Sequence, residues 1–326
     1  MQDAHTTAGL RGIHAVSERV AWASGTGGTV LRTVDGGSHW TACAVPPRAE
    51  TLDFRGVWAW SELEAEVLAS GPGEASRLYR TVDGCRIWVE ELRNEDKDGF
   101  WDVLAYETRD FGLLGDTRTG VVIGDPVKGC FETKAMVLGH GWFIDEASCT
   151  AREGESAFAA SNTSAFVFGS RRYILVTGGK GGPRALRSGL LAHRGAEMGC
   201  AASMLPLASG EESAGAFSVW FRDAKLGVVV GGDYKKPGER EGTAAWTADG
   251  GVHWTASQRP PRGYRSGVQW DEAAKAWIAV GTNGADASYD DGKTWKALDD
   301  GNWNAISWPF AVGPEGRIGK MSTPVR

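Results

Sequence analysis

The sequence lacks the features that mark membrane, metal-binding and nucleic-acid-binding proteins. No stretch approaches the ~18 apolar residues of a membrane-spanning helix, so no transmembrane segment is expected. The formal net charge of -6 offers no general attraction for nucleic acid or anionic membranes. The histidines show no His-x-x-x-His pair, the cysteines form no CxxC, and the glycine-rich stretch 178–182 lacks the Lys-Ser/Thr ending of a phosphate loop. We therefore expect no metal site and no cofactor.

The cysteines and the first residues leave the compartment of the protein open. The number of cysteines is 5, so at least one thiol stays outside any set of intrachain disulfides. Cys149–Cys200 and Cys130–Cys149 are both pairs that could form in an oxidising compartment. The start MQDAHTTAGL lacks the apolar stretch of a signal peptide. It fits a cytoplasmic start and equally an initiator methionine placed on a mature exported sequence.

What the chain has in excess is glycine and tryptophan, 46 and 15 of its 326 residues, which suits many short strands joined by tight turns. One local motif occurs at 33–40 (TVDGGSHW), 81–88 (TVDGCRIW), 247–254 (TADGGVHW) and 288–295 (SYDDGKTW). Strand-like runs flank each copy, which predicts a hairpin turn. In such a turn the Asp accepts backbone N–H groups, the Gly supplies a positive φ, and the Trp buries its ring between strands.

Aromatic-led strands recur along the whole chain, each followed by a strand that ends in glycine. They begin the segments 10–16, 54–60, 100–106, 217–221, 264–270 and 303–308, and segment 158–179 supplies one more unit. This gives about seven units of roughly 40–50 residues, a spacing typical of propeller blades. We predict an all-β fold, a single seven-bladed β-propeller domain over residues 1–326, with four-stranded antiparallel blades. The last unit stops after its third strand, so residues before Leu10 should complete it and close the ring.

The repeated motif resembles the Asp-box, or BNR repeat, whose pattern is Ser/Thr-x-Asp-x-Gly-x-Thr-Trp. The fourth copy matches this pattern in full, at Ser288, Asp290, Gly292, Thr294 and Trp295. The other copies carry His or Ile at the penultimate position, and the second has Cys in place of Gly. The resemblance implies that the turns are scaffold.

Over nearly the whole chain, the order of segments resembles bacterial proteins similar to the photosystem II stability/assembly factor, the YCF48-type propellers. The segments that carry this likeness are LRG (10–12), DFRGV (53–57), IGDP (123–126), GGDY (231–234) and GYRSGV (263–268). Members of that group are often exported, so the resemblance implies a periplasmic or extracellular protein, with a cytoplasmic one still open. We expect a monomer.

A ligand site is predicted at the top face, defined here as the face at which the innermost strands begin, because function commonly sits on loops held by such a scaffold. Three arginines begin inner strands on one arc of the ring, and four acids lie on the other arc. The arginines are Arg11, Arg55 and Arg265, and the acids are Asp102, Asp125, Glu155 and Asp233. Clustered arginines suit carboxylate recognition, and facing carboxylates could act as general acid and base in glycoside cleavage. Tyr234, Tyr264 and Trp101 could add hydroxyls and a stacking ring.

Two functions are compatible with this predicted site at the top face. One is a site for a small anionic or carbohydrate ligand, with glycoside hydrolysis of an acidic glycan as the possible reaction, catalysed by the four acids. Sialidases share the Asp-box propeller, but this chain has only FRGV where they have Phe/Tyr-Arg-Ile-Pro. The alternative is a non-catalytic interaction propeller that holds a protein partner on its top face. A structural alternative also stands for each arginine, pairing with an acid of a neighbouring blade.

Overall fold

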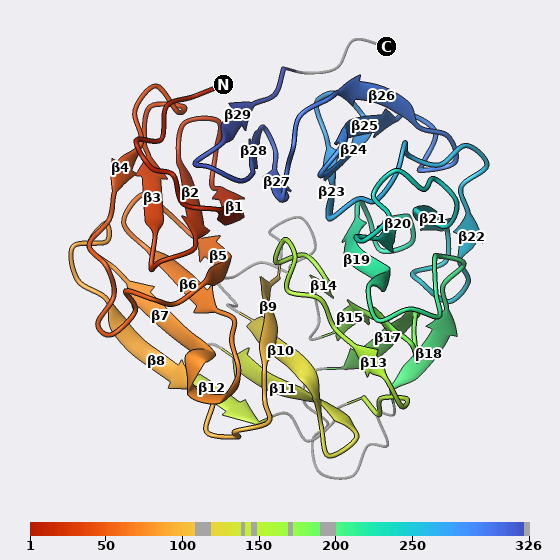
Figure 1. Ribbon diagram of the computed structural model, residues 1–326, viewed down its shortest axis with the longest axis horizontal. Helices are drawn as coiled ribbons and strands as arrows, with labels where there is room; N and C mark the ends of the chain where they lie inside the picture. The colour runs from red at the N-terminus through yellow and green to blue at the C-terminus, as the bar shows by residue number, and fades with distance from the viewer. Residues whose placement is uncertain (108–118, 138–140, 145–148, 169–171, 190–199, 323–326) are drawn as a thin grey trace.

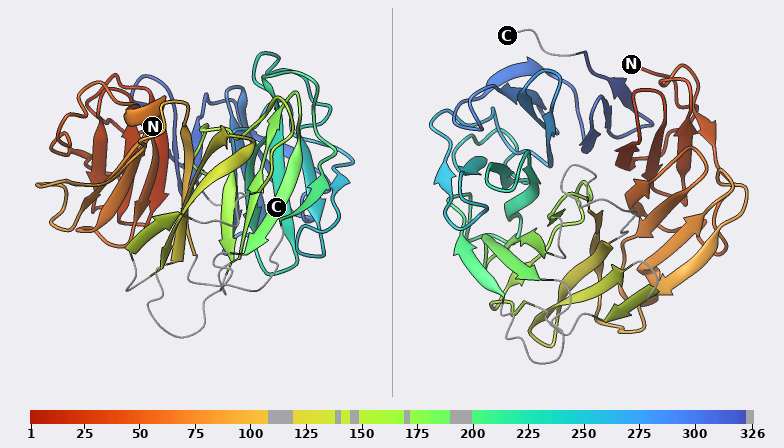
Figure 2. Two further views of the ribbon diagram at one scale, coloured as in Figure 1. Left: turned by 90° about the horizontal axis from the view of Figure 1, so that it is seen from below. Right: turned by 180° about the vertical axis from the view of Figure 1, so that it is seen from behind.

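The computed structural model describes residues 1–107, 119–137, 141–144, 149–168, 172–189 and 200–322. These residues form antiparallel sheets arranged as seven blades around a central axis (Figure 1). Seen from the side, the strands run roughly along that axis (Figure 2). The predicted all-β, seven-bladed propeller is therefore confirmed. No helix within these ranges is long and apolar enough to cross a membrane.

The first three blades are regular four-stranded sheets, and each runs from an innermost to an outermost strand. Blade one comprises β1 (Leu10–Ala15), β2 (Ala21–Gly25), β3 (Val30–Thr33) and β4 (Thr41–Ala42). Blade two comprises β5 (Phe54–Ala59), β6 (Ala65–Ala69), β7 (Arg77–Thr81) and β8 (Val89–Arg93), with the short 3-10 helix η1 (Gly73–Ala75) before β7. Blade three comprises β9 (Trp101–Tyr106), β10 (Thr119–Val127), β11 (Cys130–Val137) and β12 (Gly141–Ile144).

Blades four and five share an additional two-strand ribbon. Blade four comprises β14 (Ala165–Phe168), β15 (Arg172–Val176), β17 (Arg184–Gly189) and β18 (Ala201–Met204). Blade five comprises β19 (Ala214–Phe221), β20 (Gly227–Asp233), β21 (Ala244–Thr247) and β22 (Thr255–Ala256). The ribbon, β13 (Glu155–Ser156) and β16 (Gly178–Gly179), pairs with the start of β19 and extends that sheet at its inner edge.

The ring closes between the two ends of the chain. Blade six comprises β23 (Gly267–Asp271), β24 (Ala276–Gly281), β25 (Gly284–Ser288) and β26 (Lys296–Asp299), and blade seven comprises β27 (Ala305–Ser307), β28 (Phe310–Val312) and β29 (Ile318–Lys320). Gln2 forms an antiparallel bridge with Ile318, and its backbone N–H donates to the Ile318 carbonyl at 2.9 Å. The Trp40 indole of blade one donates to the Gln2 side chain at 3.0 Å. The N-terminal segment thus completes blade seven, as predicted.

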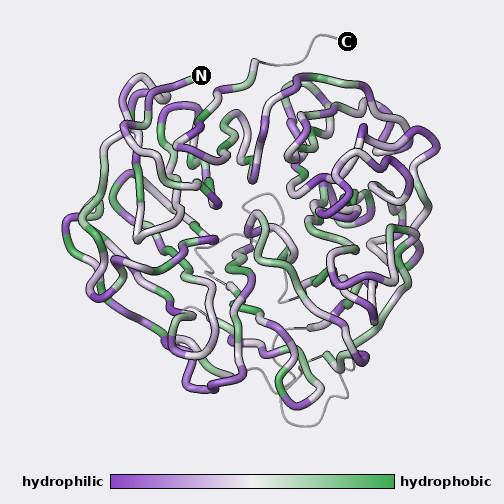
Figure 3. The backbone as a smooth tube through the Cα atoms, viewed as in Figure 1, coloured by the Kyte–Doolittle hydropathy of each residue, from purple (hydrophilic) through white to green (hydrophobic). Residues whose placement is uncertain are grey.

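The hydrophobic core lies between neighbouring blades. Inner strands such as β6 and β20 are buried along their whole length, whereas the outermost strands β4 and β22 are exposed. A strand covered on both faces by adjacent sheets gains from apolar residues on both faces. Trp22 of blade one and Trp88 of blade two meet edge to face in one such layer. Hydrophobic stretches are correspondingly short and spread through the blades (Figure 3).

The four repeated motifs fold as near-identical turns between the third and fourth strands. In the first, the Thr33 hydroxyl donates to Asp35 and accepts the Gly37 N–H at 2.9 Å. The Asp35 carboxylate accepts the His39 N–H at 3.0 Å. The remaining three turns repeat these bonds. The Ser/Thr and Asp side chains therefore satisfy the donors of the turn, as the motif predicts.

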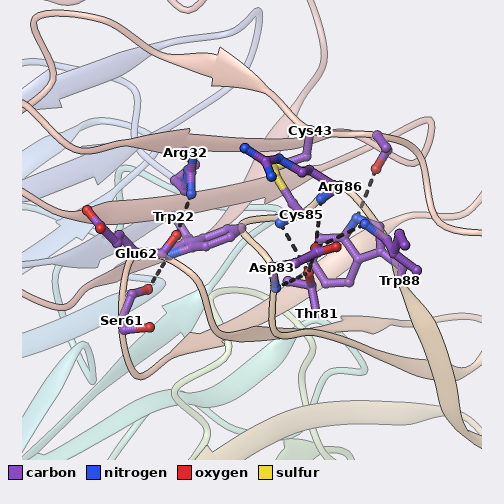
Figure 4. The surroundings of a disulfide bond; sticks show 12 residues. Trp22, Arg32, Cys43, Ser61, Glu62, Thr81, Asp83, Cys85, Arg86 and Trp88 are labelled. Atoms are coloured by element: carbon purple, nitrogen blue, oxygen red, sulfur yellow. Dashed lines mark hydrogen bonds between the residues drawn. A yellow bond between two sulfur atoms is a disulfide. The ribbon is translucent and has the colours of Figure 1, made fainter.

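Two disulfides lie in the described part of the chain, Cys43–Cys85 and Cys149–Cys200, and Cys130 is a free thiol. Cys149–Cys200 is one of the two pairs left open by the sequence. Cys85 stands where the other turns have Gly and adopts the same left-handed conformation, with φ +67. Figure 4 shows this disulfide beside Thr81 and Asp83 of the second turn. It joins blade one to blade two.

A short segment that precedes β14 reaches into the middle of the ring (Figure 1). Asn162 adopts φ +62, a conformation that Asn tolerates better than most residues. Its side chain accepts the Leu104 N–H of blade three at 2.7 Å and donates to the Val57 carbonyl of blade two at 3.4 Å. Gly56 permits this approach, because a Cβ there would lie 2.6 Å from the Asn162 oxygen.

The two neighbours of Asn162 bond to the opposite side of the ring. The Ser161 hydroxyl donates to the Ser266 carbonyl, next to blade six, at 2.6 Å. The Thr163 hydroxyl contacts the Ser218 hydroxyl of blade five at 2.7 Å. We call residues 161–163 the central tie, because they connect blades two, three, five and six through the middle of the ring.

Candidate functional site

Two of the predicted arginines lie together at the top face. Arg11 and Arg55 are the second residues of the neighbouring inner strands β1 and β5. Both point their Nε to one carboxylate oxygen of Asp53, at 3.8 Å from Arg11 and 2.8 Å from Arg55. The side chains of the two arginines are 36% and 29% exposed, so water and a ligand can reach them. Two arginines share the Asp53 carboxylate here, and the charge of Arg55 also acts on the buried Asp102. We call Arg11, Arg55 and Asp53 the arginine pair site.

Arg265 is held inside blade six. It is fully buried, and its guanidinium donates to both Asp286 of β25 and Asn283, with the Nε to Asp286 distance at 2.8 Å. Its Nη1 also donates to the Tyr264 carbonyl at 2.7 Å. Arg265 therefore pairs with an acid, as in the structural alternative given above, but the acid, Asp286, belongs to the same blade and not to a neighbouring one. A ligand contact by Arg265 remains a prediction.

Asp102 and Asp125 are brought together on blade three. Burial, followed by the negative charge of Asp125, raises the pKa of Asp102 well above its ordinary value, and the charge of Arg55 partly offsets this shift. Burial raises the pKa of Asp125 to about 6, although the Ala157 N–H donates to its carboxylate at 3.0 Å. Burial and mutual repulsion thus both favour the protonated forms of this pair of carboxyls.

Glu155 and Asp233 bond to other groups. Glu155 is buried and accepts from the Arg184 Nε at 2.8 Å and from the Thr177 hydroxyl at 2.5 Å, which fastens β13 to β17. Asp233 accepts the Lys235 N–H at 2.9 Å at the end of β20. Of the four predicted acids, only Asp102 and Asp125 are linked by a described electrostatic interaction.

The predicted aromatic residues differ in their exposure. Tyr234 is 47% exposed at the top face, and its ring centroid lies 6.5 Å from that of Tyr264. Tyr264 is buried, which raises the pKa of its phenol, and the charge of Arg11 partly opposes the rise. Trp101 is fully buried in the core between blades two and three. It therefore presents no ring face on which a sugar could stack, because packing at a strand start covers both faces of the ring.

The opposite, bottom face carries a cavity that the sequence analysis did not predict. It has a volume of about 250 Å³ and is lined by residues at the ends of inner strands, among them His14, Trp58, Trp60 and Trp220. The signal in the sequence was the ring-bearing residues in the runs GIHAV and GVWAW, namely His14, Trp58 and Trp60. Because the repeat placed the motif turns on this face, it was treated as scaffold.

Fold and site together define a seven-bladed β-propeller with a charged mouth at its top face. The chain is similar to a solved structure of YCF48 bound to D1 peptide, with a TM-score of 0.62 and 15% identity over 98% of this chain and 94% of that one. A structure of YCF48 from Cyanidioschyzon merolae is more distant, with a TM-score of 0.44 and 16% identity over 84% of this chain and 93% of that chain. No protein-family model and no curated protein matches the sequence. At 15% identity, the likeness to the structure of YCF48 bound to D1 peptide supports the fold alone.

Proposed function

We propose that the protein is a non-catalytic interaction propeller that binds a carboxylate-bearing segment of a protein partner at the arginine pair site. The observation that carries the proposal is the pairing of Arg11 and Arg55 on the single carboxylate of Asp53. Within the described residues, no hydrogen bond occupies the terminal nitrogens of either guanidinium, so both have donors left for a ligand. Guanidinium groups bind carboxylates with two parallel hydrogen bonds, which fixes orientation as well as charge.

The likeness to a propeller that was solved with a bound peptide supports a protein partner. Support for the glycoside hydrolase alternative is weaker. A hydrolase needs two carboxyl groups with room between them for the glycosidic bond and water. Asp102 is only 2% exposed, and Glu155 is occupied by Arg184. The four motif turns further support the proposal that the chain is an Asp-box propeller, distantly sialidase-like in fold alone.

We also propose that the protein is exported to the periplasm or the cell exterior. Disulfides persist in oxidising compartments and are rare in the cytosol. Cys43–Cys85 and Cys149–Cys200 join segments 42 and 51 residues apart, so both staple parts of the ring that the hydrogen-bonded sheets join only indirectly.

Selection from a displayed random peptide library tests the proposed function, with free and amidated carboxyl ends as two arms. We expect the bound peptides to be rich in Asp, Glu or free carboxyl ends. Arg11→Glu and Arg55→Glu should each weaken their binding at least about tenfold, because a charge reversal turns attraction into repulsion. Lys296→Glu, an equal charge change on the exposed outer strand β26, is the matched control and should change binding less than about twofold.

Two results would contradict the proposal. One is a selection that shows no preference for carboxylates in either arm. The other is a set of selected peptides that bind the Arg11→Glu and Arg55→Glu variants as tightly as the wild type. A melting temperature equal to that of the wild type shows that each variant is folded.

A further inference from the structure

The cavity at the bottom face has aromatic walls and one acidic group. Its lining includes the partly exposed residues Trp58, Trp60 and Trp220, which come from blades two and five, and the Trp58 ring packs against that of His14 with the ring centroids 4.3 Å apart. Glu107, the residue that follows the inner strand β9 of blade three, also lines it. Asn162 of the central tie also lines it.

The charges around the cavity select the sign of a ligand. Among the described residues that line it, Glu107 is the one carboxylate, and none is Lys or Arg. No hydrogen bond or ion pair from the described residues reaches the Glu107 carboxylate. Burial raises the pKa of Glu107, so the carboxylate is partly stripped of water. A cation in the cavity would compensate this loss, whereas an anion would be repelled.

The hydrogen-bonding groups of the cavity narrow the kind of cation. The side-chain oxygen of Asn162 already accepts the Leu104 N–H, and that of Gln269 already accepts the Trp308 N–H at 2.5 Å. The hydroxyls of Ser161, Thr163 and Ser307, which also line the cavity, bond to Ser266, Ser218 and the Ala15 N–H respectively. An ammonium with three N–H donors would therefore find the Glu107 carboxylate as the one described side-chain acceptor without a partner among the described residues. A methylated ammonium needs no acceptors and is attracted by the negative faces of indole rings. The volume of about 250 Å³ suits a small ion.

We propose that the bottom cavity is a binding site for a small methylated ammonium ion, with Trp58, Trp60 and Trp220 as its walls and Glu107 as its counter-charge. The site lies at the far ends of the strands that carry the arginine pair site, so it is separate from the proposed function. A neutral sugar would also contact indole rings and could donate hydroxyl hydrogen bonds to the Glu107 carboxylate, but it would bring no positive charge to offset the charge of that carboxylate. The experiment therefore compares a charged ligand with neutral ligands.

Calorimetric titration with choline chloride tests the proposal. The two comparison ligands are 3,3-dimethyl-1-butanol, which replaces the charged nitrogen by carbon, and glucose. We expect choline to bind at least about tenfold more tightly than either, because the attraction of a cation to desolvated rings and a carboxylate depends on its charge. Equal binding of the neutral alcohol would overturn the proposal and reveal a merely apolar cavity. Tighter binding of glucose, or no binding of choline, would also overturn it.

Variants assign the interaction to the named residues. Glu107→Gln should weaken choline binding about tenfold, whereas Glu50→Gln, an equal loss of charge in the exposed loop before β5, should leave it within about twofold. Trp58→Phe should weaken it less than Trp58→Leu, because Phe keeps a ring face and Leu does not. Where Trp58→Leu lowers the melting temperature, the Phe variant and Glu107→Gln still decide the outcome. Unchanged affinity in Glu107→Gln would refute the role of the carboxylate.

Discussion

Glu66 is a fully buried carboxyl on β6, the second strand of blade two. The Tyr106 hydroxyl donates to one of its oxygens at 2.6 Å, and its other oxygen has no hydrogen-bond partner among the described residues. Burial raises the pKa of Glu66 from 4.5 to about 8, although the bond from Tyr106 opposes the shift. At neutral pH this residue therefore keeps its proton in the folded protein.

The raised pKa predicts that stability falls as pH rises. Below pH 4.5 the folded and unfolded states both hold the proton, so the contribution is fully present. Between pH 4.5 and about 8 only the unfolded state ionises, and the free energy of unfolding declines until the pH passes the folded pKa. Glu66→Gln, which mimics the protonated form, should remove this decline and be more stable than the wild type at pH 9 by roughly 2–4 kcal/mol.

Urea unfolding at pH 5, 7 and 9 measures the effect. Tyr106→Phe, which removes the bond that lowers the pKa of Glu66, should extend the decline to higher pH. If wild type and Glu66→Gln follow parallel curves, the buried carboxyl is not the group that titrates.

Single residues were the hardest level to predict. The sequence placed Arg11, Arg55 and Arg265 at one repeat position; Arg11 and Arg55 lie at the starts of β1 and β5, whereas Arg265 lies two residues before β23. Their different environments depend on partners that the repeat does not encode. Arg265 finds Asp286 because β25 lies two strands away in the same blade, whereas Arg11 and Arg55 share Asp53 near the solvent.

Among the elements, the turns and the central tie differ in how they are specified. The four turns are built from bonds within eight residues, so a short pattern was enough to predict them. The central tie bonds to residues as far as 105 positions away, and its sequence has no strand periodicity. Contacts of that range follow from the closed ring and could not be read from a local motif.

Asn162 tests the importance of the central tie. Asn162→Ala should lower the free energy of unfolding by roughly 2–4 kcal/mol, because it leaves the buried Leu104 N–H unpaired and because Ala tolerates positive φ less well than Asn. Asn162→Gly should cost less, roughly 1–3 kcal/mol, because Gly adopts positive φ without strain. Denaturant unfolding of the two variants measures the difference. A free energy of unfolding equal to that of the wild type in the Ala variant would show that the Asn162 bonds do not stabilise the fold.

At the scale of the whole molecule, the repeat predicted the number of blades, the strand order and the closure by the N-terminal segment. The pairing of the cysteines was predicted only in part. Cys149–Cys200 was one of two open alternatives, while Cys43–Cys85 was missed because Cys85 was interpreted as a degenerate Gly of the motif. The bond between Cys85, in a turn of blade two, and Cys43, in blade one, can be predicted only once the two blades are placed side by side.

Protein isolated without reductant should contain one free thiol, Cys130, and reduction should raise the number to 5. Replacing the Cys43–Cys85 pair by Cys43→Ser with Cys85→Gly should lower the free energy of unfolding by about 2–4 kcal/mol, through loss of the crosslink. Because Gly suits φ +67, this variant removes the bond without straining the turn. Thiol titration of the denatured protein and denaturant unfolding provide the measurements. Five reactive thiols in the unreduced protein would contradict both the disulfides and the proposed export.

The central tie connects blades of the propeller through the middle of the ring, in addition to the contacts between neighbouring blades. A ring of blades joined only to their neighbours keeps its shape only while every contact between neighbours is intact. The β-pairing between Gln2 and Ile318 is a single bridge. Bonds from residues 161–163 to blades two, three, five and six hold those four blades at the middle of the ring. Detachment of the N-terminal segment would therefore weaken blade seven, but the bonds of the central tie would still hold blades two, three, five and six together and the ring would stay closed around them.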